Sequence, residues 1–319
     1  MWELIFTALG LTAFEIISSI DNAVVNASVL ATIKDRRARL AFLIFGGIVA
    51  VLVVRGLLPF IIFAAANAGM GISGVLHAVW SSDPAVTHAV ESSAPLLLMG
   101  GGVFLVLLFL HWLFVEEKHY FGFALEKHMQ TFGGVWFYTI ASFGLVGLIV
   151  SISGVMEASR AVQVILAAAI GSSAFFLTDG FKMNAERAEE RLIGENGTSA
   201  SDWAKVLFLI VIDATFSIDG VVGAFAFTMN VLLILLGNGI GALVVLYLTL
   251  RNVERIQSYV FLKTGAMYSI GALGGIMVAE AFGAHLPAWG SPLITFAAIG
   301  YFFWKSLDHN RKQGRGLSL

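Results

Sequence analysis

The sequence contains no cysteine, and this absence excludes disulfide bonds, thiolate metal sites and cysteine nucleophiles. Charged residues are scarce, at 13% of the 319 residues, whereas 58% are hydrophobic and the mean hydropathy is +0.87. A soluble globular domain carries about 25% charged residues. The composition therefore predicts a protein that crosses a membrane several times and carries no sizeable soluble domain. The net charge of −2 indicates nothing about partners.

Apolar runs recur along the whole chain. A helix needs about 20 predominantly apolar residues to cross a bilayer. Runs of that order predict an all-α membrane bundle of about nine helices in a single domain, residues 1–319. The predicted spans are 4–31, 40–66, 94–115, 134–156, 159–180, 204–228, 231–250, 259–281 and 291–307. The first run contains an acid pair and lacks a basic start and a small-residue cleavage site, which favours a retained helix over a signal peptide.

Lysine and arginine are distributed unevenly among the connections. KDRRAR, after the first span, is the most basic stretch, whereas residues 67–93 contain neither lysine nor arginine. Because cytoplasmic loops are enriched in these residues, we expect the N-terminus outside and the C-terminus in the cytoplasm. The polar segment 181–203 is then a cytoplasmic connection. The membrane is expected to be a bacterial inner membrane.

Two short acidic stretches resemble each other. FEIISSIDNAVV carries Glu15 and Asp21, and IDATFSIDGVVG carries Asp213 and Asp219 with the same spacing. Under the predicted topology the two spans run in opposite directions, which indicates an inverted repeat with halves over 1–115 and roughly 134–281. In such transporters the substrate site typically lies near the midplane, where the halves meet.

Acids inside a membrane are costly unless they are paired, hydrated or bound to a cation. Four acids in a repeat favour a cation or proton pathway, and the alternative is structural pairing with hydrogen bonds between helices. The motifs offer carboxylate, amide and hydroxyl oxygens and no histidine. This donor set suits magnesium, calcium or manganese. Arg55 is the one deeply placed base, and it could neutralise Glu15.

Helical geometry separates the two acids of each motif. On an unbroken helix one polar stripe is formed by Glu15, Ser19, Asn22 and Asn26. Asp21 lies about 120° away from Glu15, and Asp219 is displaced from Asp213 by the same angle. Either the aspartates face another neighbour, or the helix unwinds at Ser-Ile-Asp and frees backbone carbonyls as ligands. Gly220 favours unwinding in the second copy.

The residues around the two motifs resemble the TerC family of membrane proteins. FEIISSIDNAVVNA, followed by a basic turn and a span bearing Arg55, resembles the first half of that family. IDATFSIDGVVGAFAFTMN, then Asn238, then RNVERIQSYVFLKTG, resembles the second half. The resemblance covers about half of the chain. Gly220, Val222 and Leu246 replace the serine, proline and arginine of the family pattern, which indicates a divergent branch of the wider LysE-like transporter superfamily.

Members of the TerC family are implicated in manganese efflux, so the resemblance implies Mn²⁺ as the exported ion. By matching position it implies a metal site of Glu15, Asp21, Asn22, Asp213, Asp219 and Asn238. Ser19, Asn26 and Ser217 are second-tier candidates from the polar stripe and its counterpart, and Arg55 is expected to tune or lock the site.

The sequence thus predicts an exporter of a divalent cation that works by alternating access. No cofactor and no nucleic-acid partner is expected, and no nucleophile–base pair or histidine metal motif indicates an enzyme. Two alternatives stay open. The protein could export a small cationic solute, or it could be a non-transporting membrane factor that supplies metal to secreted proteins or a resistance complex.

Overall fold

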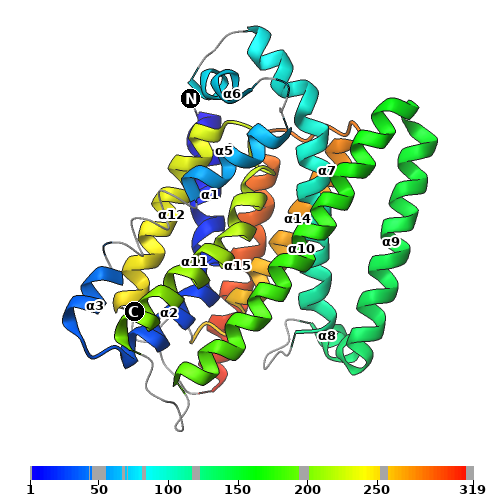
Figure 1. The fold of residues 1–319 in the computed structure, drawn as a ribbon. Helices are drawn as coiled ribbons and strands as arrows, with labels where there is room; N and C mark the ends of the chain where they lie inside the picture. Colours follow the sequence, from blue (N-terminus) through cyan, green and yellow to red (C-terminus); the bar gives the residue numbers. More distant parts are fainter. Residues whose placement is uncertain are drawn as a thin grey trace.

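The computed structural model describes residues 2–42, 44, 55–66, 69, 71–80, 84–116, 123–193, 201–251 and 258–313. Within these ranges the regular elements are helices, and no strand is present (Figure 1). The N-terminal helices are α1 (Trp2–Ser18), α2 (Ile20–Thr32), α3 (Arg36–Ala41), α5 (Arg55–Ala66), α6 (Gly71–Trp80) and α7 (Pro84–Phe114). The others are α8 (Ala124–Met129), a 3-10 turn (Gln130–Phe132), α9 (Gly133–Val155), α10 (Ala158–Ile193), α11 (Asp202–Ala224), α12 (Val231–Arg251), α14 (Leu262–Ala281) and α15 (Gly290–Lys312).

The described helices form a membrane-type bundle. Six of them are long and apolar enough to cross a bilayer, and the bent pair α1–α2 would make a seventh span. α15 is 23 residues long but less apolar than these six. Of the predicted span 40–66, residues 43 and 45–54 lie outside the described part. An all-helical integral membrane protein is therefore confirmed, whereas the count of nine spans is not.

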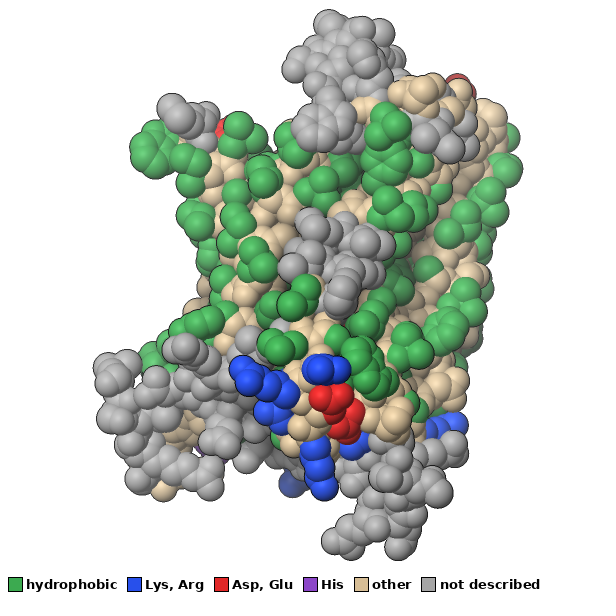
Figure 2. Space-filling view, turned by 60° about the vertical axis from the view of Figure 1, so that its left-hand side comes forward, with side chains coloured by type: hydrophobic (Ala, Val, Ile, Leu, Met, Phe, Trp, Pro, Cys, Tyr) green, Lys and Arg blue, Asp and Glu red, His purple; other side chains and the backbone are tan. Residues whose placement is uncertain are grey.

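One face of the bundle shows how apolar and basic side chains are divided. Hydrophobic side chains are spread over the upper and middle parts of this face, whereas lysine and arginine, with acidic side chains among them, gather near its lower end (Figure 2). The exposed arginines of α3, which are Arg36, Arg37 and Arg39, belong to that end of the bundle. The side chain of Asp202, at the start of α11, accepts hydrogen bonds from the backbone N–H groups of Lys34 and Asp35 at 3.0 and 2.6 Å. The α2–α3 turn and the start of α11 thus lie together.

The predicted connection 181–203 is in large part helical. α10 does not stop near residue 180 but continues to Ile193. The physical reason is local, because the added stretch FKMNAERAEERLI is rich in alanine, glutamate and arginine, which favour the helix. Residues 194–200 lie outside the described part.

The two acidic motifs adopt different backbone conformations. α1 and α2 meet at Ser19 with a bend of 50° between their axes. α11, in contrast, runs without a break through Ser217, Ile218 and Asp219. The helix is therefore broken in the first copy and continuous in the second.

Close packing of α1 against α12 depends on two glycines one turn apart. A Cβ atom at Gly237 would lie 2.5 Å from Leu11 Cβ, and one at Gly241 would lie 2.6 Å from Glu15 Cβ. Both distances are shorter than carbon atoms tolerate. Small residues at such positions allow membrane helices to approach closely, and here they bring α12 directly against the helix that carries Glu15.

We expect Gly241→Ala to destabilise the protein by about 1–3 kcal/mol, because the added methyl group overpacks the α1–α12 contact. Gly239→Ala on the same helix is the matched control, since nothing lies within 4 Å of its Cβ position. It should be neutral or slightly stabilising, because alanine favours a helix more than glycine does. Thermal unfolding of both variants in detergent measures the difference. Equal unfolding temperatures would contradict this account of the contact.

Candidate cation site

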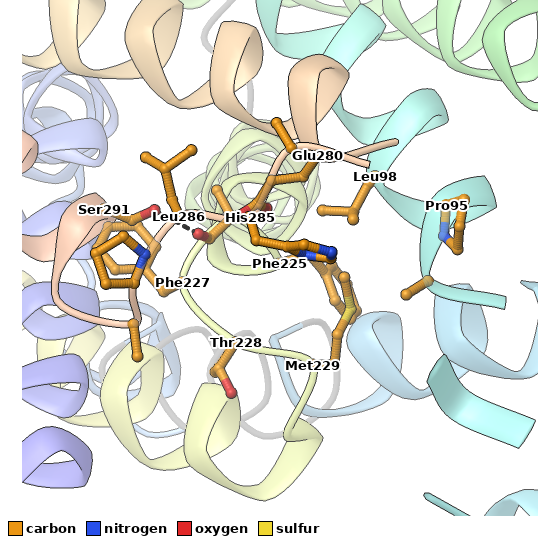
Figure 3. Close-up of a pocket in the computed structure, with 15 residues that line it drawn as sticks. Pro95, Leu98, Phe225, Phe227, Thr228, Met229, Glu280, His285, Leu286 and Ser291 are labelled. Atoms are coloured by element: carbon orange, nitrogen blue, oxygen red, sulfur yellow. Dashed lines mark hydrogen bonds between the residues drawn. The ribbon is translucent and has the colours of Figure 1, made fainter. Parts of the chain in front are cut away.

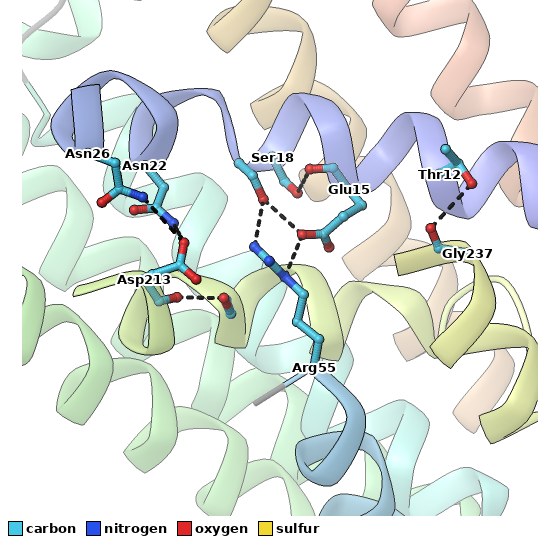
Figure 4. A network of polar contacts seen from close by, with 10 residues as sticks. Thr12, Glu15, Ser18, Asn22, Asn26, Arg55, Asp213 and Gly237 are labelled. Carbon is cyan, nitrogen blue, oxygen red and sulfur yellow. Dashed lines mark hydrogen bonds and ion pairs between the residues drawn. The ribbon is translucent and has the colours of Figure 1, made fainter. Parts of the chain in front are cut away.

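Glu15 is a fully buried acid that is compensated by a buried base. Arg55 Nε lies 2.8 Å from Glu15 Oε1, and the two side chains are 4% and 0% exposed (Figure 4). Ser19 Oγ donates a hydrogen bond to the same oxygen at 2.9 Å, and Arg55 donates to Ser19 Oγ at 3.4 Å. The expected neutralisation of Glu15 by Arg55 is confirmed. The three residues tie the end of α1, the break at Ser19 and the start of α5 together.

The second carboxylate oxygen of Glu15 faces α11. A Cβ atom at Gly220 would lie 2.5 Å from Glu15 Oε2, so only a glycine allows this approach. The expectation that Gly220 favours unwinding is wrong, because this residue lies inside a continuous helix and leaves room for the acid. Glu15 Oε2 itself is buried and has no hydrogen-bond partner among the described residues.

Asp213 faces α2 and is held there by two amides. The side-chain NH₂ groups of Asn22 and Asn26, one helical turn apart, both donate to Asp213 Oδ1, that of Asn26 at 3.5 Å (Figure 4). Ser217 Oγ donates at 2.5 Å to the backbone carbonyl of Asp213, one turn earlier on α11. The two halves of the predicted repeat therefore meet at this acid.

The side-chain amide oxygens of Asn22 and Asn26 accept no hydrogen bond from the described residues. Asn22 Oδ1 and Asn26 Oδ1 are buried and have no hydrogen-bond partner in the described part of the chain. Because each amide directs its NH₂ group to Asp213, its oxygen points elsewhere. A buried acceptor without a partner costs about 1–3 kcal/mol, and a ligand that accepts lone pairs would remove this cost.

The charges of the group do not cancel. Asp213 forms no ion pair with any described residue, although Arg55 interacts with it electrostatically as well as with Glu15. Two carboxylates and one guanidinium sum to −2 + 1 = −1. An uncompensated negative charge inside an apolar bundle favours the binding of a cation.

Asp219 has a different environment. It faces α10, where Lys182 forms an ion pair with its Oδ2 atom, and both side chains are more than four-fifths buried. Lys182 falls within the predicted cytoplasmic connection 181–203, so the sequence pattern does not predict its ion pair with Asp219. The helix-forming residues after Lys182 were the available signal, because they extend α10 and keep the lysine on the helix. Asp219 Oδ1 is buried without a hydrogen-bond partner among the described residues.

For two other predicted site residues, Asn238 and Asp21, the structure describes no hydrogen-bond partner of the side chain. Asn238 is 0% exposed on α12, and neither atom of its amide has a hydrogen-bond partner among the described residues. It lies on α12 next to Gly237, which packs on Leu11, and within one turn of Gly241, which packs on Glu15. Asp21 belongs to α2, but its side chain lies outside what the structure describes.

The arrangement has the chemistry of an oxygen-donor site. No group of three or more histidine, cysteine, aspartate or glutamate side chains gathers within the described ranges, so the carboxylates alone do not build a metal centre. The NH₂ groups of Asn22 and Asn26 face Asp213, so their amide oxygens would join its carboxylate as ligands only after the amides turn over. Carboxylate and amide oxygens together suit hard divalent cations.

The fold and the acidic interior define a polytopic helical membrane protein with a polar site inside the bundle. The family model described as "Protein of unknown function (DUF475)" matches residues 20–313, so the chain belongs to this family. No curated protein and no solved structure gives a significant match.

Arg55→Met should strongly destabilise the protein, because it leaves Glu15 as an unpaired charge at a fully buried position. Removal of one partner of a buried ion pair typically costs about 3–5 kcal/mol. The double variant Glu15→Gln/Arg55→Met leaves no charge behind and should recover a large part of that loss. Unfolding in detergent tests both variants. If the double variant is no more stable than Arg55→Met, the ion pair is not what Arg55 supplies.

Proposed function

We propose that the protein exports a divalent metal cation, Mn²⁺ first, through the interior site around Asp213. The observation that carries this proposal is the pairing of an uncompensated buried carboxylate with two amides whose oxygens lack donors. Each of these groups is costly in an apolar bundle by itself, and a cation would relieve all of them if the two amides turned their oxygens toward the carboxylate of Asp213. The ion is the substrate of the protein and not a resident cofactor.

The bend at Ser19 supports a transport mechanism. Glu15 lies on α1, whereas Asn22 and Asn26 lie on α2 beyond the bend. A change in the angle between α1 and α2 would therefore move the amides relative to Glu15 and Arg55. Broken helices serve this purpose in transporters, where they line the substrate site near the midplane. Arg55 would hold the charge of Glu15 while the ion is absent.

The membrane arrangement belongs to the same proposal. We infer nine spans related by an inverted repeat, with the N-terminus outside a bacterial inner membrane and the C-terminus in the cytoplasm. The resemblance to the TerC family and the distribution of lysine and arginine support this frame. The two copies would not contribute equally, because the first is broken at Ser19 whereas the second runs through a continuous helix.

Mn²⁺ flux into proteoliposomes that contain the purified protein tests the proposal. Asp213→Asn should abolish the flux, because it removes the uncompensated charge. Asn26→Leu should raise the half-saturating Mn²⁺ concentration about tenfold or more, as the loss of a group that orients a metal ligand typically does. Asp308→Asn is the control, since this acid lies near the end of α15 and pairs with Lys312.

Three outcomes would contradict the proposal. Full Mn²⁺ flux through Asp213→Asn would exclude the site. Flux of lysine that Mn²⁺ does not inhibit would favour export of a cationic solute. Mn²⁺ binding that depends on Asp213, without any flux above that of protein-free vesicles, would favour a membrane factor that holds metal without transporting it.

A further inference from the structure

A second polar site lies at the end of the bundle where α11 and α14 end and α15 begins. A cavity of about 480 Å³ opens there between these ends and α7 (Figure 3). Its lining is mostly apolar, and its polar side chains are Thr228, Glu280, His285 and Ser291. Ser291 Oγ is engaged, since it donates to the carbonyl of Ala226 at 2.6 Å. Asp202, at the N-terminal end of α11, contacts the turn before α3, whereas the cavity lies at the C-terminal end of α11. The cavity is therefore at the other end of the bundle from the basic helix α3.

The carboxylate of Glu280 occupies an electrostatically unfavourable place. It belongs to the last turn of α14, which ends at Ala281, and the C-terminal end of a helix is its negative end. An acid there is destabilised by the helix dipole. No lysine or arginine is among the residues that line the cavity. Glu280 is partly exposed and accepts a hydrogen bond from the backbone N–H of Leu286, and the exposed His285 lines the same cavity without an ion-pair contact to it. An acid held in this place favours a cation in the cavity.

The cavity lies at the far end of α11 from Asp213, because its lining residue Phe225 follows Asp213 by 12 residues, or about 18 Å of helix. Its lining includes Phe225 and Phe227, which are 3% and 6% exposed. The ring of Phe227 packs against that of Phe14 with centroids 5.5 Å apart, and Phe14 directly precedes Glu15 in α1. Figure 3 shows Phe225, Phe227, Glu280 and His285 among the residues that line the cavity. The ring contact between Phe227 and Phe14 thus joins the lining of the cavity to α1.

We propose that Glu280 and His285 bind a divalent transition-metal cation in this cavity, which serves as a station for the ion beyond the interior site. The place of this station on the transport route rests on the proposed function. Its ligand chemistry does not, since one carboxylate and one imidazole suit Mn²⁺, Co²⁺ or Zn²⁺, whereas Mg²⁺ and Ca²⁺ prefer oxygen ligands alone. The imidazole would add selectivity that the oxygen donors around Asp213 lack.

Mn²⁺ binding to the full-length protein in detergent, measured by electron paramagnetic resonance, tests this site. The wild type should bind two ions, and Glu280→Gln or His285→Gln should each lose one. The station should also give a nitrogen hyperfine coupling from imidazole, which an oxygen-donor site cannot produce. This coupling should persist in Asp213→Asn and disappear in His285→Gln. Glu157→Gln, an exposed acid outside the cavity, and His309→Gln, in the last turn of α15, are the matched controls.

The outcomes separate the two proposals. If Glu280→Gln and His285→Gln bind as many ions as the wild type, the station does not exist, whatever Asp213→Asn does. The same holds if a control variant loses the nitrogen coupling. If Asp213→Asn binds as many ions as the wild type while Glu280→Gln loses one, the interior site fails and the station stands.

Discussion

The burial of Glu15 is the constraint on which the arrangement of the central helices depends. A carboxylate at 0% exposure inside an apolar bundle must be compensated, and here compensation comes from several elements at once. Arg55, at the start of α5, forms an ion pair with Glu15. Ser19, at the bend between α1 and α2, donates a hydrogen bond to the same carboxylate. Gly220 and Gly241 let α11 and α12 approach it from other directions. The compensation of Glu15 thus constrains where α2, α5, α11 and α12 lie relative to α1.

This constraint also explains why the two acidic motifs are not equivalent. The first copy bends at Ser19, where the hydroxyl is used by Glu15, so that α2 leaves at an angle and presents Asn22 and Asn26 to Asp213. The second copy stays helical, because Gly220 is needed for close packing and not for a turn. The first copy of the motif therefore contains a bend, whereas the second copy is a continuous helix.

The two aspartates of the second copy show how environment assigns different roles to the same residue type. Asp219 has its own base in Lys182, whereas Asp213 is bound by amides that cannot neutralise it. Among the described residues, Asp213 is therefore the acid of this motif that has no base as an ion-pair partner, and this is costly in an apolar surrounding.

Some of this could be predicted from the residues alone. Long apolar runs determine membrane helices because hydrophobicity is a local property, and the depth of Arg55 along its span was enough to pair it with Glu15. The predicted stripe that joins Glu15 to Asn22 and Asn26 assumed an unbroken helix. The 50° bend divides it, so that its two ends serve different acids.

The remaining features depend on how helices rotate and pack. Which neighbour Asp219 faces follows from the rotation of α11 against α10, and no local pattern encodes that angle. The cavity with Glu280 and His285 is assembled from the ends of helices distant in sequence. The sequence by itself determined an apolar helical bundle with costly acids inside it. Only the tertiary structure decided which of the described acids are paired with a base and which is held by amides instead, because charge compensation depends on distances between helices.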